Sequence, residues 1–376
     1  GYRTVTLTKG QGAKAGRVKL EGRYYRIDTP FYEVEICKDN GQITTLYDRT
    51  RDWYVVRRED IGWRLKKGVL NELKVHVEEP TAMSSWTIGN VRTVHNLLDG
   101  AVSEVIADGD AEIRLRFTHT FQDSTIAQDI VLAPSSPVIR FDTRVDWQEW
   151  GDFDRDAPML KAHFTPDVMA CKAVFETPFG VAERHTLDRE VPALTWADLA
   201  DDERGFALMN DSKYGYKILG NQMELTLIRS GWLPDPKSDV GQHAFSYAIL
   251  PHSGDYVKGQ VADHAQILNR PLVVSPTAKD GAHSLLSLAS DKAVLSGIKR
   301  SEDGKAIIAR IYNPTGEPAD ALVRWGFAPT GTATWLNLLE EALPDGPNAP
   351  KLTMVDGGVT FRMEPRKIVS LRIPIA

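Results

Sequence analysis

Hydrophobic and polar residues alternate along much of this chain. The alternation is clearest in residues 113–121, 139–147 and 223–227, where nearly every second side chain is apolar and the residues between are charged or hydroxylated. A period of two places successive side chains on opposite faces of an extended strand. The pattern therefore predicts large antiparallel sheets with one face in a core.

The most specific turn signal is the Asp-Asn-Gly sequence at residues 39–41, between the strand-like stretches 31–36 and 43–47. Asn-Gly readily adopts the positive φ of a tight hairpin, so these stretches are predicted to pair. Helical signal is scarce, and its best candidate is residues 255–268, which Pro271 ends. No repeat of propeller or solenoid length recurs. We therefore predict an all-β fold.

Changes in composition divide the chain into parts. Residues 8–17 are typical of a flexible link, and residues 275–284 are polar and rich in turn-forming residues. Because the chain opens on Gly1 and an early strand without an evident partner, we expect a piece cut from something longer. The predicted parts are an end strand of a preceding domain with its link at 1–17, a large β domain at 18–284 and a small β-sandwich at 285–376.

Composition narrows the functional classes. The chain has 376 residues, with 45 Lys and Arg against 51 Asp and Glu, a formal charge of −6. A mildly acidic chain lacks the positive field that nucleic acid or anionic lipid requires, and no apolar run approaches the length of a membrane span. We therefore expect neither nucleic acid nor membrane as a partner. The cysteines, Cys37 and Cys171, are too few and too far apart for a disulfide framework or a thiolate zinc site.

Nucleotide-binding, metalloprotease and serine-hydrolase motifs are absent from the sequence, and the histidines show no ligand spacing. We therefore expect no metal in this chain. No pair among the 51 acidic residues stands out as a catalytic dyad, so no catalytic residue is assigned.

The most informative segment is the long loop at residues 229–243, between two predicted strands. A tryptophan beside charged residues suits sugars, since the ring can cover C–H faces while charged groups bind hydroxyls. Trp86 could be a second platform. The alternative is a proline-stiffened turn whose tryptophan packs on the sheet and whose aspartates cap backbone amides. The candidate binding residues here and in the turn at 210–214 are Asn210, Asp211, Lys213, Tyr214, Arg229, Trp232, Asp235, Asp239 and His243.

Short segments occur in an order that one enzyme family shares. They are residues 41–48, 175–184, 207–215, 225–230, 234–247, 298–299, 310–313, 337–341 and 364–368. Together they resemble the C-terminal half of glycoside hydrolase family 38 α-mannosidases of the bacterial type. The resemblance spans essentially the whole chain.

The resemblance implies a galactose mutarotase-like antiparallel supersandwich followed by a small C-terminal β-sandwich. It also implies a retaining, zinc-dependent enzyme acting on α-mannosides. Its zinc ion, nucleophile and acid/base residue would lie in an N-terminal catalytic α/β domain outside this sequence. The present chain would support that domain, line part of the sugar site and be inactive alone. Bacterial relatives without signal peptides imply a cytoplasmic location.

Two other functions stay open. The chain could be a stand-alone carbohydrate-binding or interaction module. It could also be a mutarotase-like enzyme, in which His243 would have to face a carboxylate in an open cleft. If a catalytic domain normally covers part of the chain, exposed apolar side chains are expected around the loops of residues 207–247.

Overall fold

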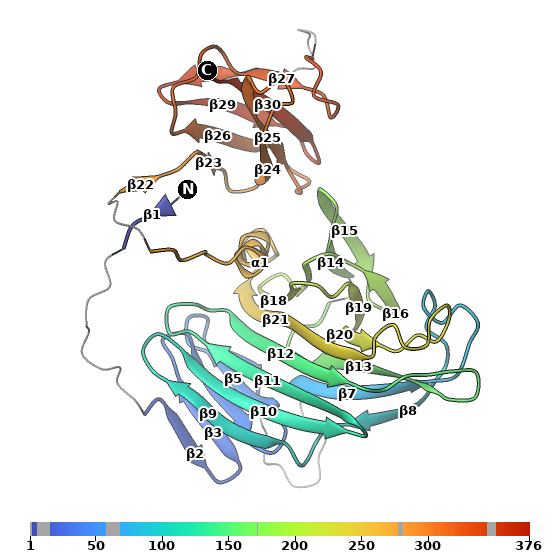
Figure 1. The fold of residues 1–376 in the computed structure, drawn as a ribbon. Helices are drawn as coiled ribbons and strands as arrows, with labels where there is room; N and C mark the ends of the chain where they lie inside the picture. Colours follow the sequence, from blue (N-terminus) through green and yellow to red (C-terminus); the bar gives the residue numbers. More distant parts are fainter. Residues whose placement is uncertain (1, 6–15, 58–67, 171, 277–280, 344–350) are drawn as a thin grey trace. The chain divides into compact units, whose positions relative to one another are not determined.

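The computed structural model describes residues 2–5, 16–57, 68–170, 172–276, 281–343 and 351–376. The chain forms two compact units (Figure 1). The large unit comprises Gly10–Glu176 and Glu183–Pro271, and the small unit comprises Gly1–Lys9, Thr177–Ala182 and Leu272–Ala376. Most of the link predicted at residues 8–17, and Cys171, lie outside the described residues, whereas Cys37 is buried.

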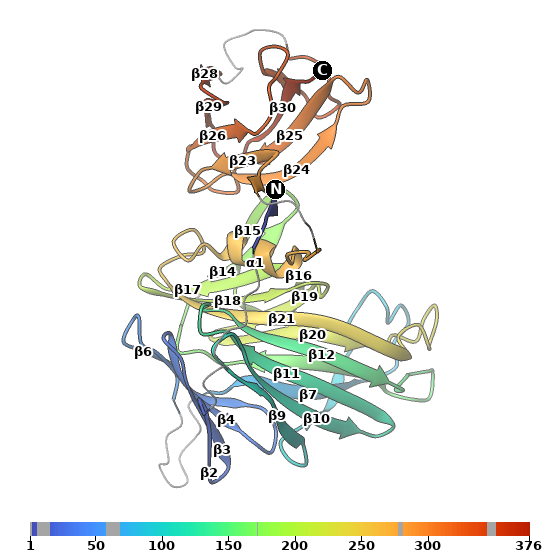
Figure 2. The ribbon, with the colours of Figure 1, turned by 60° about the vertical axis from the view of Figure 1, so that its left-hand side comes forward.

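The described residues of the large unit form two antiparallel sheets, which face each other in Figures 1 and 2. The first has the order β15-β14-β17-β18-β21-β12-β11-β10-β9. Its strands are β9 (Val102–Asp108), β10 (Ile113–Phe121), β11 (Ser124–Leu132), β12 (Ile139–Trp147), β14 (Lys172–Thr177), β15 (Gly180–His185), β17 (Trp196–Ala200), β18 (Arg204–Asn210) and β21 (Gly241–Ser253).

The second sheet has the order β16-β19-β20-β13-β7-β5-β4-β3-β2, with β6 beside β5 and β8 beside β7. Its strands are β2 (Val18–Glu21), β3 (Tyr24–Asp28), β4 (Tyr32–Cys37), β5 (Ile43–Asp48), β6 (Trp53–Val56), β7 (Leu70–Glu78), β8 (Val91–Asn96), β13 (Ala157–Phe164), β16 (Leu187–Pro192), β19 (Gly215–Leu219) and β20 (Gln222–Arg229). The prediction of large antiparallel sheets is confirmed.

Alternation decides which side chains enter the space between the two sheets. In β10 and β12 the apolar positions are buried, and the residues between them are mostly half-buried. The predicted hairpin also forms, with β4 paired to β5. Gly41 takes φ 72° at its turn, and a Cβ there would lie 3.0 Å from Cγ of Phe117, so glycine is required.

A small polar network sits inside this apolar core. Asn71 Nδ2 donates to Gln128 Oε1 over 2.7 Å, Gln128 Nε2 donates to the Tyr247 hydroxyl over 2.7 Å, and that hydroxyl donates to Asn71 Oδ1 over 2.6 Å. All three residues are buried, on β7, β11 and β21. The closed triangle therefore links the two sheets with every one of these groups paired.

The predicted helix exists but is shorter than expected. Helix α1 spans Val261–Asn269, whereas residues 255–260 form turns that end at Gln260 in the left-handed conformation, φ 51°. Val261 and Ala265 carry its buried face. Among the described residues, no helix is both long and apolar enough to cross a membrane.

The small unit contains two four-stranded antiparallel sheets, ordered β23-β26-β29-β28 and β24-β25-β30-β27. Their strands are β23 (Leu286–Ala289), β24 (Val294–Arg300), β25 (Ala306–Tyr312), β26 (Ala319–Trp325), β27 (Thr334–Leu336), β28 (Thr353–Val355), β29 (Gly358–Met363) and β30 (Ile368–Pro374). Trp335 and Phe361 meet edge to face in its core, with ring centroids 4.8 Å apart. The opening strand β1 (Tyr2–Arg3), which seemed partnerless in the sequence, pairs with β22 (Ala282–His283).

Candidate functional site

The predicted binding residues fall into two groups in the large unit, and Arg229 anchors the first. Its Nη2 lies 2.9 Å from Glu78 Oε2, and the same nitrogen donates to the Thr87 carbonyl over 2.6 Å. The Glu78 side chain is almost fully buried, and it also accepts from the Gly89 amide. Arg229 therefore ties the end of β20 to β7 and to the loop after it through Nε and Nη2.

Trp232 is held by the same loop. Its backbone N–H and that of Leu233 donate to Ser84 Oγ over 2.9 and 3.1 Å. The half-buried indole packs edge to face on Phe153, with centroids 6.1 Å apart. Its Nε1 is buried and has no hydrogen-bond partner among the described residues. The contact found for the ring is thus with a neighbouring loop, whereas the structural alternative predicts packing on the sheet.

The remaining residues of this loop mainly hold its own turns. Asp235 Oδ1 accepts from the Lys237 amide over 3.0 Å, as the capping alternative predicts. His243 Nε2 lies 2.7 Å from the carbonyl oxygen of Asp239, which fixes that nitrogen as the donor. The partner that this bond gives His243 is a backbone carbonyl, whereas the mutarotase-like alternative requires a carboxylate.

The turn at residues 210–214 forms the second group. Asn210 is fully buried, and its amide donates to the Leu194 carbonyl and the Tyr216 hydroxyl while its Oδ1 accepts from the Lys213 amide over 2.6 Å. These bonds satisfy the Asn210 side chain inside the fold, where it shapes the turn. The Tyr214 side chain, by contrast, is 58% exposed.

Strand β21 brings this turn toward the long loop. Asp211 Oδ2 accepts from the Ser246 amide over 2.8 Å, and the Lys213 ammonium lies 4.2 Å from the centroid of the Phe245 ring. Burial lowers the pKa of Lys213, and attraction to Asp211 and Asp239 opposes that change. Lys213, Asp211 and Asp239 therefore form one charged cluster beside His243.

Three loops gather at one end of the large unit, on the right-hand side of Figure 1: residues 80–90, 149–157 and 230–240. We call them the loop surface. Trp86 is 64% exposed and Phe153 76% exposed, while two cations lie near the Trp150 ring, with Arg155 Cζ at 4.2 Å and Lys237 Nζ at 4.9 Å from its centroid. The loop surface combines open aromatic rings with charge, the combination expected for sugars or for another protein surface.

A second polar region was missed in the sequence. The strands β7, β13 and β20 turn one set of side chains to the core and the other set to the opposite side, which we call the outer face. On it, Lys161 lies 2.7 Å from Glu190 and 3.3 Å from Glu224, and Lys217 lies 3.3 Å from Glu224. His76 and His163 lie beside them. The alternation correctly indicates that these side chains point away from the core, and it predicts that they are exposed to solvent. The side chains of Lys161 and Glu224 are, however, only 4% and 7% exposed.

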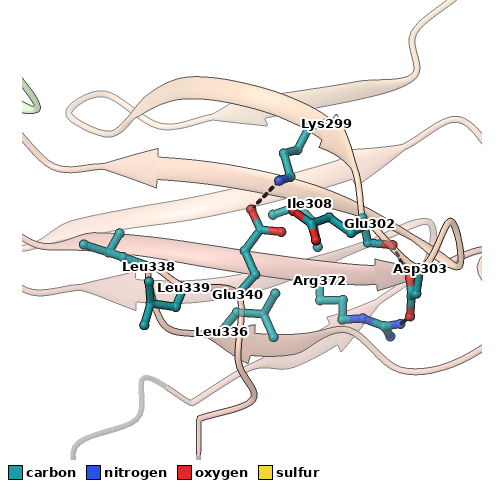
Figure 3. A pocket seen from close by; sticks show the side chains of 10 residues that line it. Lys299, Glu302, Asp303, Ile308, Leu336, Leu338, Leu339, Glu340 and Arg372 are labelled. Atoms are coloured by element: carbon teal, nitrogen blue, oxygen red, sulfur yellow. Dashed lines mark hydrogen bonds and ion pairs between the residues drawn. The ribbon is translucent and has the colours of Figure 1, made fainter.

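The small unit carries a hollow of about 400 Å³ on one of its sheets (Figure 3). Four of its charged side chains form two pairs: Lys299 Nζ lies 2.9 Å from Glu340 Oε1, and Arg372 Nη2 lies 3.3 Å from Asp303 Oδ2. Leu339, at the rim, is 80% exposed. None of the predicted binding residues lies here.

Comparisons with known proteins agree with this fold. Residues 27–237 match the family described as the glycosyl hydrolases family 38 C-terminal domain, and residues 292–371 match its C-terminal beta sandwich domain. Alpha-mannosidase 2C1 of Mus musculus is 32% identical over 263 residues, which are 66% of this chain and 24% of that protein. Alpha-mannosidase G of Dictyostelium discoideum is 26% identical over 77% of this chain and 27% of its own length.

Solved structures support the same fold. A crystal structure of an alpha-mannosidase from Enterococcus faecalis covers 92% of this chain with a TM-score of 0.71 and 15% identity, and the match takes up 42% of that chain. A second structure from this organism, of a family 38 glycosyl hydrolase, covers 98% with a TM-score of 0.72, over 45% of its own length. The present chain thus spans about a quarter of the curated relatives named above. It belongs to glycosyl hydrolase family 38 and corresponds to the C-terminal β domains of that family.

Proposed function

We propose that this chain is the C-terminal β part of a retaining, zinc-dependent α-mannosidase. The observation that carries the proposal is that both C-terminal family descriptions match in order, while the chain spans about a quarter of relatives named alpha-mannosidase. A retaining glycosidase needs two carboxylates about 5 Å apart, one of them a nucleophile. We assign neither carboxylate, nor the zinc ligands, to this chain, and we expect them in the catalytic domain of the longer protein.

In this proposal the loop surface meets the catalytic domain and completes the wall of the sugar site. Trp86 and Phe153 offer exposed aromatic rings. Such rings can cover the C–H faces of a mannoside. Arg229 and Asn210 act as positioning residues, because their polar atoms already hold the loop and the turn in place.

The first prediction concerns activity. The purified chain of 376 residues is expected not to hydrolyse an aryl α-mannoside, with or without added Zn²⁺, since the reaction needs the carboxylates of the catalytic domain. Release of the aryl group is the measurement. Zinc-dependent hydrolysis by this chain that disappears with a chelator would contradict the proposal.

The same preparation tests the alternatives. Calorimetric binding of mannose or mannobiose that is lost in Trp232→Ala and kept in Tyr54→Ala, an exposed ring on β6, would favour a stand-alone binding module. A polarimetric rate of sugar mutarotation above the buffer rate would favour the mutarotase-like enzyme. The exposed rings of Trp86 and Phe153 are the observation that keeps the first alternative in view.

A further inference from the structure

Three polar residues meet on the outer face of the large unit. His76, His163 and Glu224 come from β7, β13 and β20, which are neighbours in the sheet. The register places His163 directly opposite Glu224, but it places His76 opposite Met159, four residues from His163. Four residues of extended strand span about 13 Å. Since the two Nε2 atoms nevertheless lie 3.1 Å apart, the His76 and His163 side chains lean toward each other along the strands.

The donor atoms lie at distances that suit a metal ion. His76 Nε2 and His163 Nε2 are 3.1 Å apart, and one ligand atom from each of the three residues lies within 4.8 Å of the others. Two imidazole nitrogens bound to tetrahedral zinc at its usual bond length are separated by about 3.4 Å. The His–His distance therefore nearly matches one edge of such a site. Glu224 Oε1 lies 3.7 Å from His163 Nδ1, so the Glu224 side chain must turn toward the Nε2 atoms for all three residues to share one ion.

The charges around the cluster leave one carboxylate in excess. Each lysine has its own nearest acid: Lys74 lies 3.0 Å from Glu72, Lys161 lies 2.7 Å from Glu190, and Lys217 lies 2.6 Å from Asp188. Glu224 is only the second and longer partner of Lys161 and Lys217, at 3.3 Å from each. Both lysines would keep their closer acid if Glu224 turned to a cation. The acids of the cluster therefore outnumber its lysines by one, although Lys74, Lys161 and Lys217 lie close enough to lower the pKa of both histidines.

The protonation state also suits a metal. Burial, and after it the lysines, lower the pKa of His76 to about 4, and burial lowers that of His163 to about 2. Both rings are therefore neutral at pH 7, and a metal ion need not displace a proton from an imidazolium. Without a metal, one Nε2–H donates to the other Nε2.

We propose that His76, His163 and Glu224 form a binding site for a divalent transition-metal ion of the zinc class. Two imidazoles and one carboxylate suit zinc and its neighbours, whereas magnesium and calcium prefer oxygen ligands alone. The site leaves a fourth position for water. This inference does not depend on the proposed function.

The test titrates the untagged chain, after treatment with a chelator, with Zn²⁺ at neutral pH by calorimetry, and with Co²⁺ by visible absorption. We expect one ion per chain and a nitrogen-ligated Co²⁺ spectrum. His76→Ala and His163→Ala should each weaken binding at least about 100-fold, since loss of even an outer-shell partner costs 10- to 100-fold. Glu224→Gln should weaken it less. The matched control is His95→Ala on β8, which pairs with Val75 and contacts Phe121 rather than this cluster.

The result is decisive either way. No binding at about 100-fold excess of Zn²⁺, or binding that His163→Ala leaves unchanged, overturns the proposal and leaves a hydrogen-bonded histidine pair. Circular dichroism and the Tm of each variant establish that it is folded. If His163→Ala fails to fold, His76→Asn gives the same reading, because asparagine keeps polarity and roughly the size but removes the imidazole ligand.

Discussion

The two faces of strands β7, β13 and β20 differ in chemistry far more than in burial. The inner face holds apolar residues such as Phe164, which is fully buried. The outer face holds Lys161 and Glu224, which are nearly as inaccessible, at 4% and 7% exposure. The inner face is stabilised by removal of apolar area from water, whereas the outer face depends on pairing every charge. On these strands, a side chain that points away from the core is therefore not necessarily exposed to water.

The largest expected effect is on the inner face. Phe164→Ala should lower the free energy of unfolding of the large unit by about 4 kcal/mol, since it leaves a cavity among Phe141, Phe206 and Tyr247. Urea denaturation is the measurement. Phe153→Ala is the control, and it should change stability by less than about 0.5 kcal/mol because that ring is 76% exposed. Equal effects would mean that the inner face is not the main core.

The next effect measures the outer face. Lys161→Met should lower the free energy of unfolding by about 3 kcal/mol, because it leaves the nearly buried Glu224 and the partly buried Glu190 with fewer partners. Lys172→Met is the control: its partner Glu183 lies at 2.6 Å, but both side chains are about half exposed, and the change should cost under about 1 kcal/mol. If the two variants unfold at the same urea concentration, the charges of the outer face are solvated, and the proposed difference between buried and exposed ion pairs is wrong.

The smallest effect concerns a polar residue within the core. Burial lowers the pKa of His119 on β10 to about 4, below its ordinary value of 6.5. The unfolded chain therefore takes up the proton first as pH falls, so this contribution to stability is complete above pH 6.5 and is lost toward pH 4. Between pH 6.5 and about pH 5 the loss is about 2 kcal/mol.

The measurement is the difference between the original chain and His119→Gln in urea unfolding across that pH range. The variant should lose about 2 kcal/mol less over the interval, since glutamine does not titrate there. A constant difference at all pH values would place His119 in contact with water. Above pH 7 the histidine is neutral in both the folded and the unfolded chain, so the difference in stability between the two proteins at that pH serves as the internal control.

Much of the fold was readable from the sequence, for physical reasons that individual elements show. Strand β10 occupies the predicted residues 113–121 because its alternation is strict. Helix α1 begins six residues later than predicted, since Gln260 takes a left-handed conformation that the apolar spacing does not reveal. The loop at 229–243 was found from its composition, but its contacts with Ser84 and Glu78 join parts of the chain that sequence distance keeps apart.

The outer-face cluster could not be predicted for a similar reason. His76 and His163 are 87 positions apart, and they meet because β7 and β13 are neighbours in the sheet. Glu224 joins them because β20 is the other neighbour of β13. Strand order depends on long-range pairing, which alternation leaves open. The same holds for Glu224, whose excess charge appears only once the three lysines have been assigned to their nearest acids.

The triangle of Asn71, Gln128 and Tyr247 has a consequence for how the large unit assembles. Apolar side chains tolerate many arrangements of similar free energy, because they remain in apolar surroundings when one sheet shifts against the other. The triangle tolerates no such shift. Displacing one sheet against the other would leave an amide or a hydroxyl buried without a hydrogen-bond partner, at about 1–3 kcal/mol for each unpaired group. These three residues therefore favour one alignment of the two sheets over other compact arrangements of the same apolar core.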